Sequence, residues 1–318
     1  MDYKEKTRDL RSKIEKALAP CVDRNYVFLD LPYHPNVGDT LIAMAAKEYL
    51  NKTPYKCLYS SSEFTFDDRE IKPDTLIIFN GGGNFGDLWP RYTIFRNKII
   101  KKYPKNKILI LPQSVSYSDN LNLAVDVELY SSCANITVCA RDKFSYNFLC
   151  EHFRKNNILL VPDMAFYTSD NYLNHRTTSK GKTLFLYRSD KELQSELDYS
   201  QVPQEAERHD WPTMESGDKV YKVYNSFNYV NARIEKYISN KIAWRLKDLY
   251  WQKKLHPYNV RRGVDFVDEY EVIYTTRLHV MILGFLLGKE VYVFDNSYKK
   301  NSALYETWLN DVPTIQMV

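Results

Sequence analysis

The 318-residue sequence predicts an α/β protein with two Rossmann-like domains that face a cleft. Short apolar runs alternate with helical stretches, which is typical of a parallel sheet covered by helices on both faces. A polar interval near residue 170 interrupts this alternation, which then resumes. The length also fits two domains of roughly 100–200 residues each. We therefore expect domains at 1–170 and 178–318, with the last helix packing back on the first domain.

The first half begins with a predicted helix at Tyr3–Leu18, where Leu10, Ile14 and Leu18 recur every four residues. Five buried strands and four helices should then follow in strict alternation. The strands are Tyr26–Leu31, Thr75–Asn80, Lys107–Leu111, Ile136–Ala140 and Ile158–Val161. The helices are Asp39–Leu50, Arg91–Lys102, Leu121–Ser131 and Arg141–Phe153.

The second half follows a polar interval, Tyr167–Lys182, which is typical of a linker. The tract Ser189–Gly217 is also polar, and we expect it to be a loop. The regular elements are predicted strands at Thr183–Tyr187, Glu271–Thr275 and Val291–Asp295, and predicted helices at Arg277–Leu287 and Ser302–Leu309. In such a fold, ligands are expected at the carboxyl ends of the strands.

Composition excludes several classes of protein. No apolar run approaches the roughly 18 residues that span a bilayer, and the first residues lack the apolar stretch of a secretory signal. The five cysteines are odd in number and include no C-x-x-C pair, which disfavours a disulfide framework and a zinc ribbon. We expect a cytoplasmic protein without a metal site.

Positive charge is concentrated in one tract. Between Lys219 and Arg262 there are eleven Lys or Arg and two acids, a net charge of +9 in a chain whose total is +4. A stripe at helical spacing within this tract is either core-facing, with a solvated basic face, or part of a surface that docks on an anionic membrane or a lipid diphosphate. Near-neutral overall charge and the lack of a binding motif disfavour nucleic acid. The stripe consists of Ile242, Leu246, Leu249 and Tyr250, and the candidate lipid contacts are Trp244, Lys247, Trp251, Lys253 and Lys254.

Three motifs follow predicted strands. The first, at 34–40, contains His34, Asn36 and Asp39 on a strand-to-helix turn, where Gly38 permits a tight turn. Asp39 could serve as a helix cap or as a ligand contact. The second, at 80–87, is a formal G-x-G-x-x-G without the acid that dinucleotide binding needs after the next strand. A glycine loop that presents backbone N–H groups to a ligand is the better interpretation, with Gly83, Asn84 and Asp87 as contacts.

The third motif, at 275–279, places Arg277 and His279 at a helix N-terminus, where anions are favoured. An arginine fork suits carboxylate or phosphate, and the imidazole could donate or accept a proton. The alternative is an interface arginine with a surface histidine. Polar residues that follow other predicted strands are Gln113, Arg141, Asp163, Arg188 and Lys300. Four of the residues at predicted strand ends are cations, which indicates an anionic substrate. They are Arg141, Arg188, Arg277 and Lys300.

Eight ordered blocks resemble the polysaccharide pyruvyl transferase family, from about residue 25 to 311. They are HPNVGDTLI, NGGGNFGD, LPQS, ARDKFSYNFL, PDMAF, YRSD, TTRLH and FDNSYKKNSALYETW. Two departures are Lys299 and Val280, at positions where the family leads us to expect Gly.

The resemblance implies a fold similar to B-type glycosyltransferases and transfer of pyruvate from phosphoenolpyruvate onto two hydroxyls of a sugar, as a cyclic ketal. No cofactor is implied beyond this donor, and the acceptor is expected to be lipid-linked. The R-L-H motif implies donor binding by Arg277, Leu278 and His279, to which the cleft adds Arg188, Arg141 and Lys300. We hypothesise that His279 is the acid and that His34 or Asp39 is the base, although these roles could be reversed. The expected acceptor contacts are His34, Asn36, Asp39, Gly83, Asn84, Asp87 and Gln113.

Two rival functions share this sequence pattern. One is a B-type glycosyltransferase that uses a nucleotide sugar, which would need a base-stacking and ribose-binding site in the second half. The other is a non-catalytic protein that binds an anionic metabolite in the same cleft.

Overall fold

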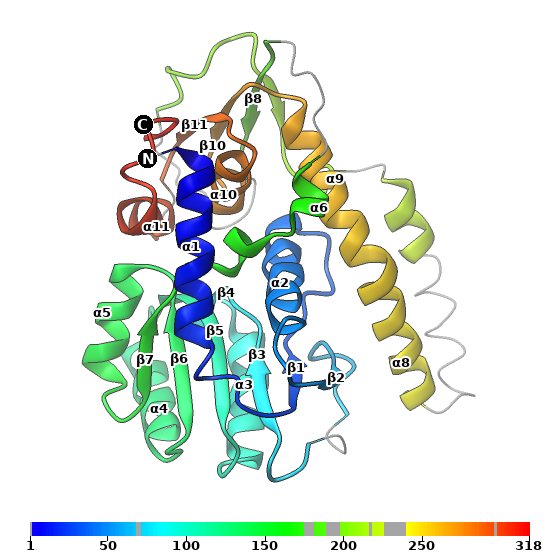
Figure 1. Cartoon of the computed structure of the whole chain (residues 1–318), viewed down its shortest axis with the longest axis vertical. Helices are drawn as coiled ribbons and strands as arrows, with labels where there is room; N and C mark the ends of the chain where they lie inside the picture. The colour runs from blue at the N-terminus through cyan, green and yellow to red at the C-terminus, as the bar shows by residue number, and fades with distance from the viewer. Residues whose placement is uncertain are drawn as a thin grey trace.

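The computed structural model describes residues 2–67, 71–174, 181–188, 198–215, 218–225, 240–295 and 298–318, which form two sheets with surrounding helices (Figure 1). The first sheet consists of β1 (Tyr26–Leu29), β2 (Cys57–Ser60), β3 (Leu76–Phe79), β4 (Gly82–Gly86), β5 (Ile108–Ser116), β6 (Ile136–Ala140) and β7 (Asn157–Leu160). The second consists of β8 (Thr183–Leu186), β9 (Glu207–His209), β10 (Val272–Thr275), β11 (Glu290–Val293) and β12 (Ile315–Met317).

The strand orders are those of two parallel sheets. The first is β2-β1-β3-β5-β6-β7 with β4 paired to β5, and the second is β12-β11-β10-β8-β9. All of these pairings are parallel. The predicted α/β class with two Rossmann-like halves is therefore confirmed. The likeness to B-type glycosyltransferases stays a prediction.

Helices cover both sheets. They are α1 (Tyr3–Leu18), α2 (Val37–Leu50), α3 (Pro90–Lys102), α4 (Asn120–Ser131), α5 (Lys143–His152), η2 (Met164–Tyr167), α6 (Asp170–Leu173), α8 (Asn240–Tyr250), the π-helical turn η3 (Trp251–Leu255), α9 (His256–Asp268), α10 (Leu278–Leu286) and α11 (Lys300–Trp308). Residues 219–225 are also helical. The predicted linker contains α6, and residues 175–180 of that interval lie outside the described part.

Two strands lie where loops were predicted. The tract Ser189–Gly217 contains β9, which pairs with β8, while its residues 189–197 and 216–217 lie outside the described part. The glycine-rich segment forms β4 beside β5. Gly86 has a φ of +115°, and a Cβ there would lie 1.9 Å from the Ser116 carbonyl oxygen. Glycine is therefore required for this close pairing.

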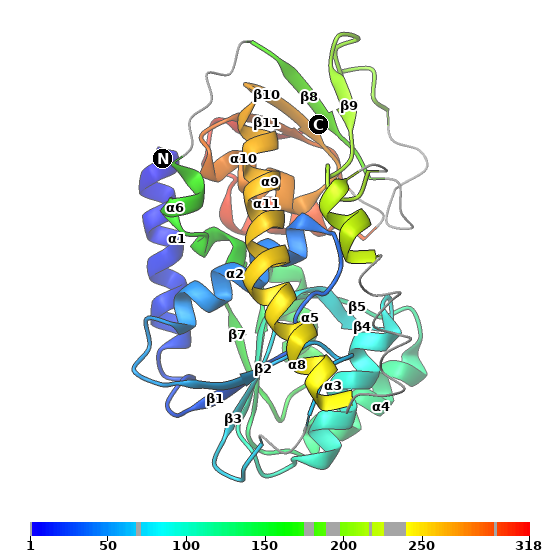
Figure 2. The ribbon, with the colours of Figure 1, turned by 90° about the vertical axis from the view of Figure 1, so that its right-hand side faces the viewer.

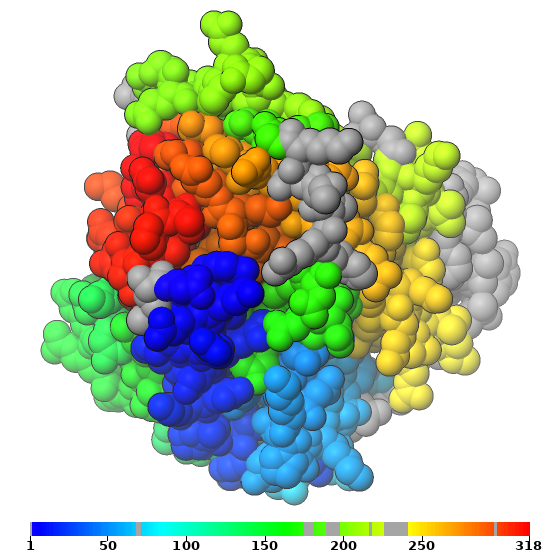
Figure 3. Space-filling model, turned by 45° about the horizontal axis from the view of Figure 1, so that its top comes forward, coloured from blue at the N-terminus to red at the C-terminus, as the bar shows by residue number. Residues whose placement is uncertain are grey.

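One hydrophobic cluster extends through both halves. A single buried cluster contains Leu10 and Ile42 together with Leu184 and Ile282 of the second half. Helix α1, whose predicted apolar stripe is buried, contacts both η2 and α10. Figure 3 shows α1 in blue against the orange segments of the second half. Helix α11 returns to the first half, where Trp308 Nε1 donates to the Arg141 carbonyl at 2.7 Å.

A continuous helical run, α8–η3–α9, crosses from the first half to the second (Figure 2). Its inward side carries polar residues four positions apart. Asp248 Oδ1 accepts from Tyr33 Oη at 2.6 Å, Gln252 Nε2 donates to the Ser60 carbonyl at 3.0 Å, and His256 Nε2 lies 2.9 Å from the Pro32 carbonyl oxygen. This row holds the segment that leads from β1 to His34.

His256 should make the protein sensitive to mild acid. It is fully buried, and burial lowers its pKa to about 3. The unfolded histidine binds a proton below about pH 6.5 and the folded one does not, so this residue lowers stability as pH falls. Between pH 6.5 and 5 we expect wild type to lose about 2 kcal/mol of unfolding free energy relative to His256→Gln. Urea denaturation of both proteins at several pH values measures this difference, and parallel pH profiles would contradict it.

Candidate active site

A cleft of about 460 Å³ lies between the two halves, at the carboxyl ends of strands from both sheets. The first half contributes His34, Pro35, Asn36, Asp39, Gly83, Asn84, Trp89, Arg91, Tyr92 and Arg141. The second half contributes Arg188, Trp211, Met214, Arg277, Leu278, His279 and Lys300. The cleft thus gathers every residue that the sequence proposed for donor binding and catalysis, because strand ends of a parallel sheet meet at one edge.

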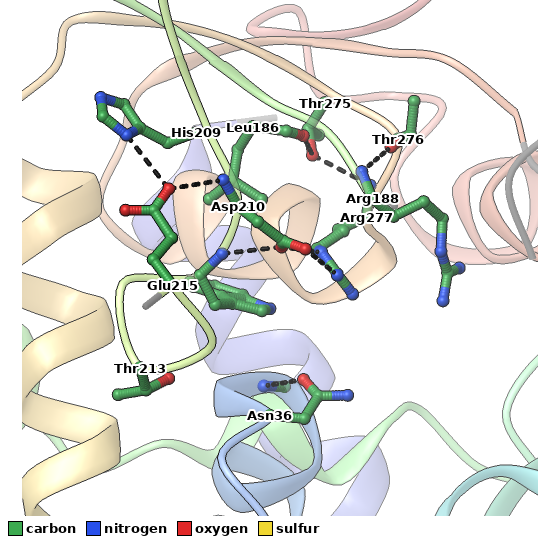
Figure 4. Close-up of polar contacts among 12 residues, drawn as sticks. Asn36, Leu186, Arg188, His209, Asp210, Thr213, Glu215, Thr275, Thr276 and Arg277 are labelled. Carbon is green, nitrogen blue, oxygen red and sulfur yellow. Dashed lines mark hydrogen bonds and ion pairs between the residues drawn. The ribbon is translucent and has the colours of Figure 1, made fainter. Parts of the chain in front are cut away.

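Arg277 precedes α10 as its N-cap residue and is almost fully buried. Its backbone N–H donates to Thr275 Oγ1 at 2.9 Å. Its Nε and Nη2 donate to the two carboxylate oxygens of Asp210, both at 2.6 Å (Figure 4). Such a two-point pair fixes the plane of the guanidinium. Asp210 directly follows β9, in the tract that was predicted to be a loop. It was not among the predicted site residues.

The segment around Asp210 joins the second half to the His34 loop (Figure 4). Glu215 Oε1 accepts from the Asp210 backbone N–H at 3.1 Å and lies 3.2 Å from His209 Nδ1. Thr213 Oγ1 donates to the Pro35 carbonyl at 2.6 Å. The position of Arg277 is therefore linked to the opposite wall of the cleft through the segment 209–215.

His279 lies beside a buried carboxylate. Its Nε2 is 3.6 Å from Asp163 Oδ2, which also accepts from Arg141 Nη1 at 2.8 Å. Burial alone would raise the pKa of Asp163, but the neighbouring His279, Arg141 and the Ala165 backbone N–H lower it below its ordinary value. Asp163 is therefore ionised at neutral pH, and this negative charge faces the imidazole of His279.

Gly38 allows the two halves to meet at His279. A Cβ at Gly38 would lie 2.4 Å from His279 Nδ1. The role predicted for this glycine, a tight turn, is wrong, because Gly38 lies in the first turn of α2. Asn36 is the N-cap residue, with its side chain accepting from the Gly38 backbone N–H at 3.0 Å. Asp39 is not the cap.

His34 stands on the wall opposite Arg277. Its Nε2 is 3.3 Å from Tyr92 Oη and 3.6 Å from Asp39 Oδ2. Asn36 Nδ2 donates to the same Asp39 oxygen at 2.9 Å. Burial lowers the pKa of His34, Asp39 opposes this change, and Arg91 adds to it. The resulting neutral imidazole can accept a proton at neutral pH.

Cations from both halves converge at Gly83. A Cβ there would lie 3.1 Å from Lys300 Nζ and 3.2 Å from Arg141 Nη2. Lys299, which precedes α11, has a left-handed φ of 54°. This conformation favours glycine, the residue that the resemblance leads us to expect at this position. Behind the cleft, Asn84 Oδ1 accepts from the buried Arg96 at 2.8 Å.

Two predicted acceptor contacts do not line the cleft. The Asp87 carboxylate accepts from the backbone N–H groups of Ser118 and Asp119, both at 2.8 Å, and so fixes a surface loop. Gln113 is fully buried, and its Nε2 donates to the Asn80 carbonyl at 2.8 Å. Both predictions relied on proximity to a strand end, which does not determine where a side chain points.

The predicted lipid contacts differ in how deeply they are buried. Trp251 is buried and stacks on Tyr33, with the two ring centroids 5.1 Å apart. The prediction that Trp251 contacts lipid is therefore wrong. Trp244 and Lys247 are half-buried, whereas Lys253 and Lys254 are exposed. The residues that line the cleft but were not among the predicted contacts are Pro35, Trp89, Arg91, Tyr92, Trp211 and Met214.

No helix in the described ranges is long and apolar enough to cross a membrane. Within the same ranges, no three His, Cys, Asp or Glu residues are grouped so that they could hold a metal ion.

The chain is similar to known proteins in both sequence and fold. The family model described as "Polysaccharide pyruvyl transferase" matches residues 36–298. The chain is 32% identical to EpsO of Bacillus subtilis (strain 168), whose name assigns it provisionally to the pyruvyl transferases, over 100% of this chain and 96% of EpsO. It is 28% identical to Pyruvyl transferase 1 of Schizosaccharomyces pombe, over 90% of this chain and 70% of that protein. The crystal structure of a functionally uncharacterised Klebsiella pneumoniae protein shares the fold, with a TM-score of 0.65, 23% identity and 98% of each chain covered.

Proposed function

This chain belongs to the polysaccharide pyruvyl transferase family, and we propose that it transfers pyruvate from phosphoenolpyruvate onto two hydroxyls of one sugar. The products are a cyclic ketal and inorganic phosphate. The observation that supports this most is the convergence of Arg141, Arg188, Arg277 and Lys300 in a cleft that also holds His279. Phosphoenolpyruvate carries a carboxylate and a phosphate, which require several cations in one site.

The first chemical step is protonation of the donor. His279, held beside the ionised Asp163, gives a proton to the methylene carbon of phosphoenolpyruvate. The central carbon then has oxocarbenium character, and the first sugar hydroxyl forms a C–O bond to it. The hydroxyl proton passes to neutral His34, with Asp39 stabilising the imidazolium that forms. The intermediate is a ketal that still carries phosphate.

The second step completes the ring. The bond between the central carbon and the phosphate oxygen breaks, and phosphate leaves with the electron pair. The second hydroxyl then bonds to the same carbon and gives its proton back to His279, which completes the cyclic ketal, while His34 passes the first hydroxyl's proton to the leaving phosphate. The cations of the cleft stabilise the charge that develops on the leaving phosphate. The net reaction consumes one donor and one diol, and no oxidant or reductant is needed.

The acceptor in this proposal is a sugar of a polysaccharide repeat unit carried on a polyprenyl diphosphate. Asn36, Gly83 and Asn84 offer polar groups on the His34 side of the cleft. Trp89, which is half-buried, adds apolar ring surface to the same cleft, and aromatic rings that combine apolar faces with polar edges suit sugars.

Asp39→Asn should reduce turnover at least tenfold, because the variant removes the charge that supports His34 as a base. Phosphate release from phosphoenolpyruvate, measured with a panel of sugar diols, is the assay. Asp87→Asn is the matched control, since Asp87 lies in a neighbouring loop outside the cleft, and its turnover should match wild type. If Asp39→Asn lost less than tenfold, Asp39 would only support the first turn of α2.

A further inference from the structure

The exposed side chains that the structure describes on α8 and η3 are of two kinds. Every exposed side chain described in these elements is aliphatic or cationic. The aliphatic ones are Ile242, Leu246 and Leu249, which are 57%, 51% and 57% exposed, and the cations are Lys241, Arg245, Lys253 and Lys254. We call these seven residues the basic–aliphatic face. The stripe predicted from the sequence is therefore not core-facing at these three aliphatic positions.

The orientation of this face is fixed by contacts on the inward side of the helix. Asp248, the acid of α8, is buried and accepts hydrogen bonds from Tyr33 and Thr65, both at 2.6 Å. Trp251 stacks on Tyr33, and Tyr250 stacks on Tyr224 with ring centroids 5.9 Å apart. The aliphatic residues follow an i, i+4, i+7 spacing on the side of the helix that faces away from Asp248 and Trp251. They cannot turn inward without breaking these contacts.

We propose that the basic–aliphatic face docks on the surface of an anionic lipid bilayer. Aliphatic side chains on one side of a surface helix can enter the boundary between headgroups and acyl chains, while flanking cations attract anionic lipids. The charge pattern matches this occupant, because no exposed carboxylate is described on α8 or η3. Two further exposed arginines, Arg261 and Arg262, continue the same helical run into α9 (Figure 2).

The face lies near the mouth of the cleft. Phe64 is 52% exposed, and Lys247 Nζ of α8 stands 5.9 Å from the centre of its ring. The Arg91 guanidinium lies 5.5 Å from the same ring and also lines the cleft. Docking would therefore bring the cleft close to the lipid headgroups. This last point, unlike the docking itself, rests on the proposed function, because it gives a lipid-linked acceptor a direct route to the site.

Flotation with vesicles tests the docking without any substrate. Wild type should float with vesicles of equal phosphatidylglycerol and phosphatidylcholine, should remain unbound with phosphatidylcholine alone, and should be released by salt. Lys253→Gln/Lys254→Gln should lower the partition coefficient about 25-fold, at about fivefold for each cation. Ile242→Ser/Leu246→Ser/Leu249→Ser should also lower it at least tenfold.

The matched control is Leu121→Ser/Val125→Ser on α4, where two aliphatic side chains one turn apart are 75% and 56% exposed. This variant should float as wild type does. Equal binding to anionic and neutral vesicles, or equal loss in the α4 control, would overturn the proposal. So would self-association through the face, seen as a dimer in light scattering that the triple serine variant abolishes without any vesicle binding. Because flotation needs no donor and donor binding needs no vesicles, a failure here leaves the proposed transfer reaction untouched.

Discussion

His279→Gln should lower turnover by about 10²–10⁴-fold, the usual contribution of a general acid. Glutamine approximates the size of the imidazole but cannot donate a proton at neutral pH. The ion pair of Asp163 with Arg141, at 2.8 Å, does not depend on His279 and should survive the change. Donor binding should therefore persist while the chemistry is lost, so the loss should appear in kcat more than in KM.

Phosphate release and melting curves with phosphoenolpyruvate together measure this outcome. His152→Gln, on the outer helix α5 and away from the cleft, is the matched control and should keep normal turnover. Near-normal turnover in His279→Gln would show that another group is the acid.

Asp210→Ala should lower kcat/KM about 100-fold by releasing the Arg277 guanidinium from its two-point pair. A buried arginine that has lost its carboxylate partner should shift, and the donor contact would then be misplaced. Asp210→Asn, which keeps an oxygen acceptor but loses the charge, should have an intermediate effect.

A double-mutant cycle separates this positioning role from a general structural one. If Asp210 acts through Arg277, adding Asp210→Ala to Arg277→Ala should cost little further kcat/KM. Thermal melts of all four proteins identify any loss of folded enzyme. Fully additive losses in the cycle would contradict the positioning role.

Most regular elements were predictable because their apolar periodicity is strong. The predicted helix Tyr3–Leu18 coincides with α1, and the predicted strand Ile136–Ala140 coincides with β6. The strands β9 and β4 were not predictable, because a three-residue polar segment and a glycine run carry no apolar pattern. These two strands are defined by their pairing with β8 and β5, which are separated from them in the sequence. Such pairing depends on the tertiary structure.

The candidate site was predictable to the extent that it follows strand ends. That rule brings His34, Arg141 and Arg277 into one cleft. It gives no information on Asp210, whose role depends on a short strand beside β8, or on Tyr92, which lies in the first turn of α3. A similar limitation explains why Trp251 was predicted as a lipid contact but is buried. Helical spacing identifies a stripe, but not which side of the helix the first half covers.

A thermal stability scan with phosphoenolpyruvate, UDP and GDP distinguishes a pyruvyl transferase from a nucleotide-sugar glycosyltransferase. A ligand at about 100 times its dissociation constant adds about 2.7 kcal/mol of stability, and no acceptor is needed. We expect phosphoenolpyruvate alone to stabilise wild type and to have no effect on Arg277→Ala, in which its cleft partner is missing. Stabilisation by a nucleotide, with none from phosphoenolpyruvate, would contradict the account and indicate a nucleotide-sugar glycosyltransferase.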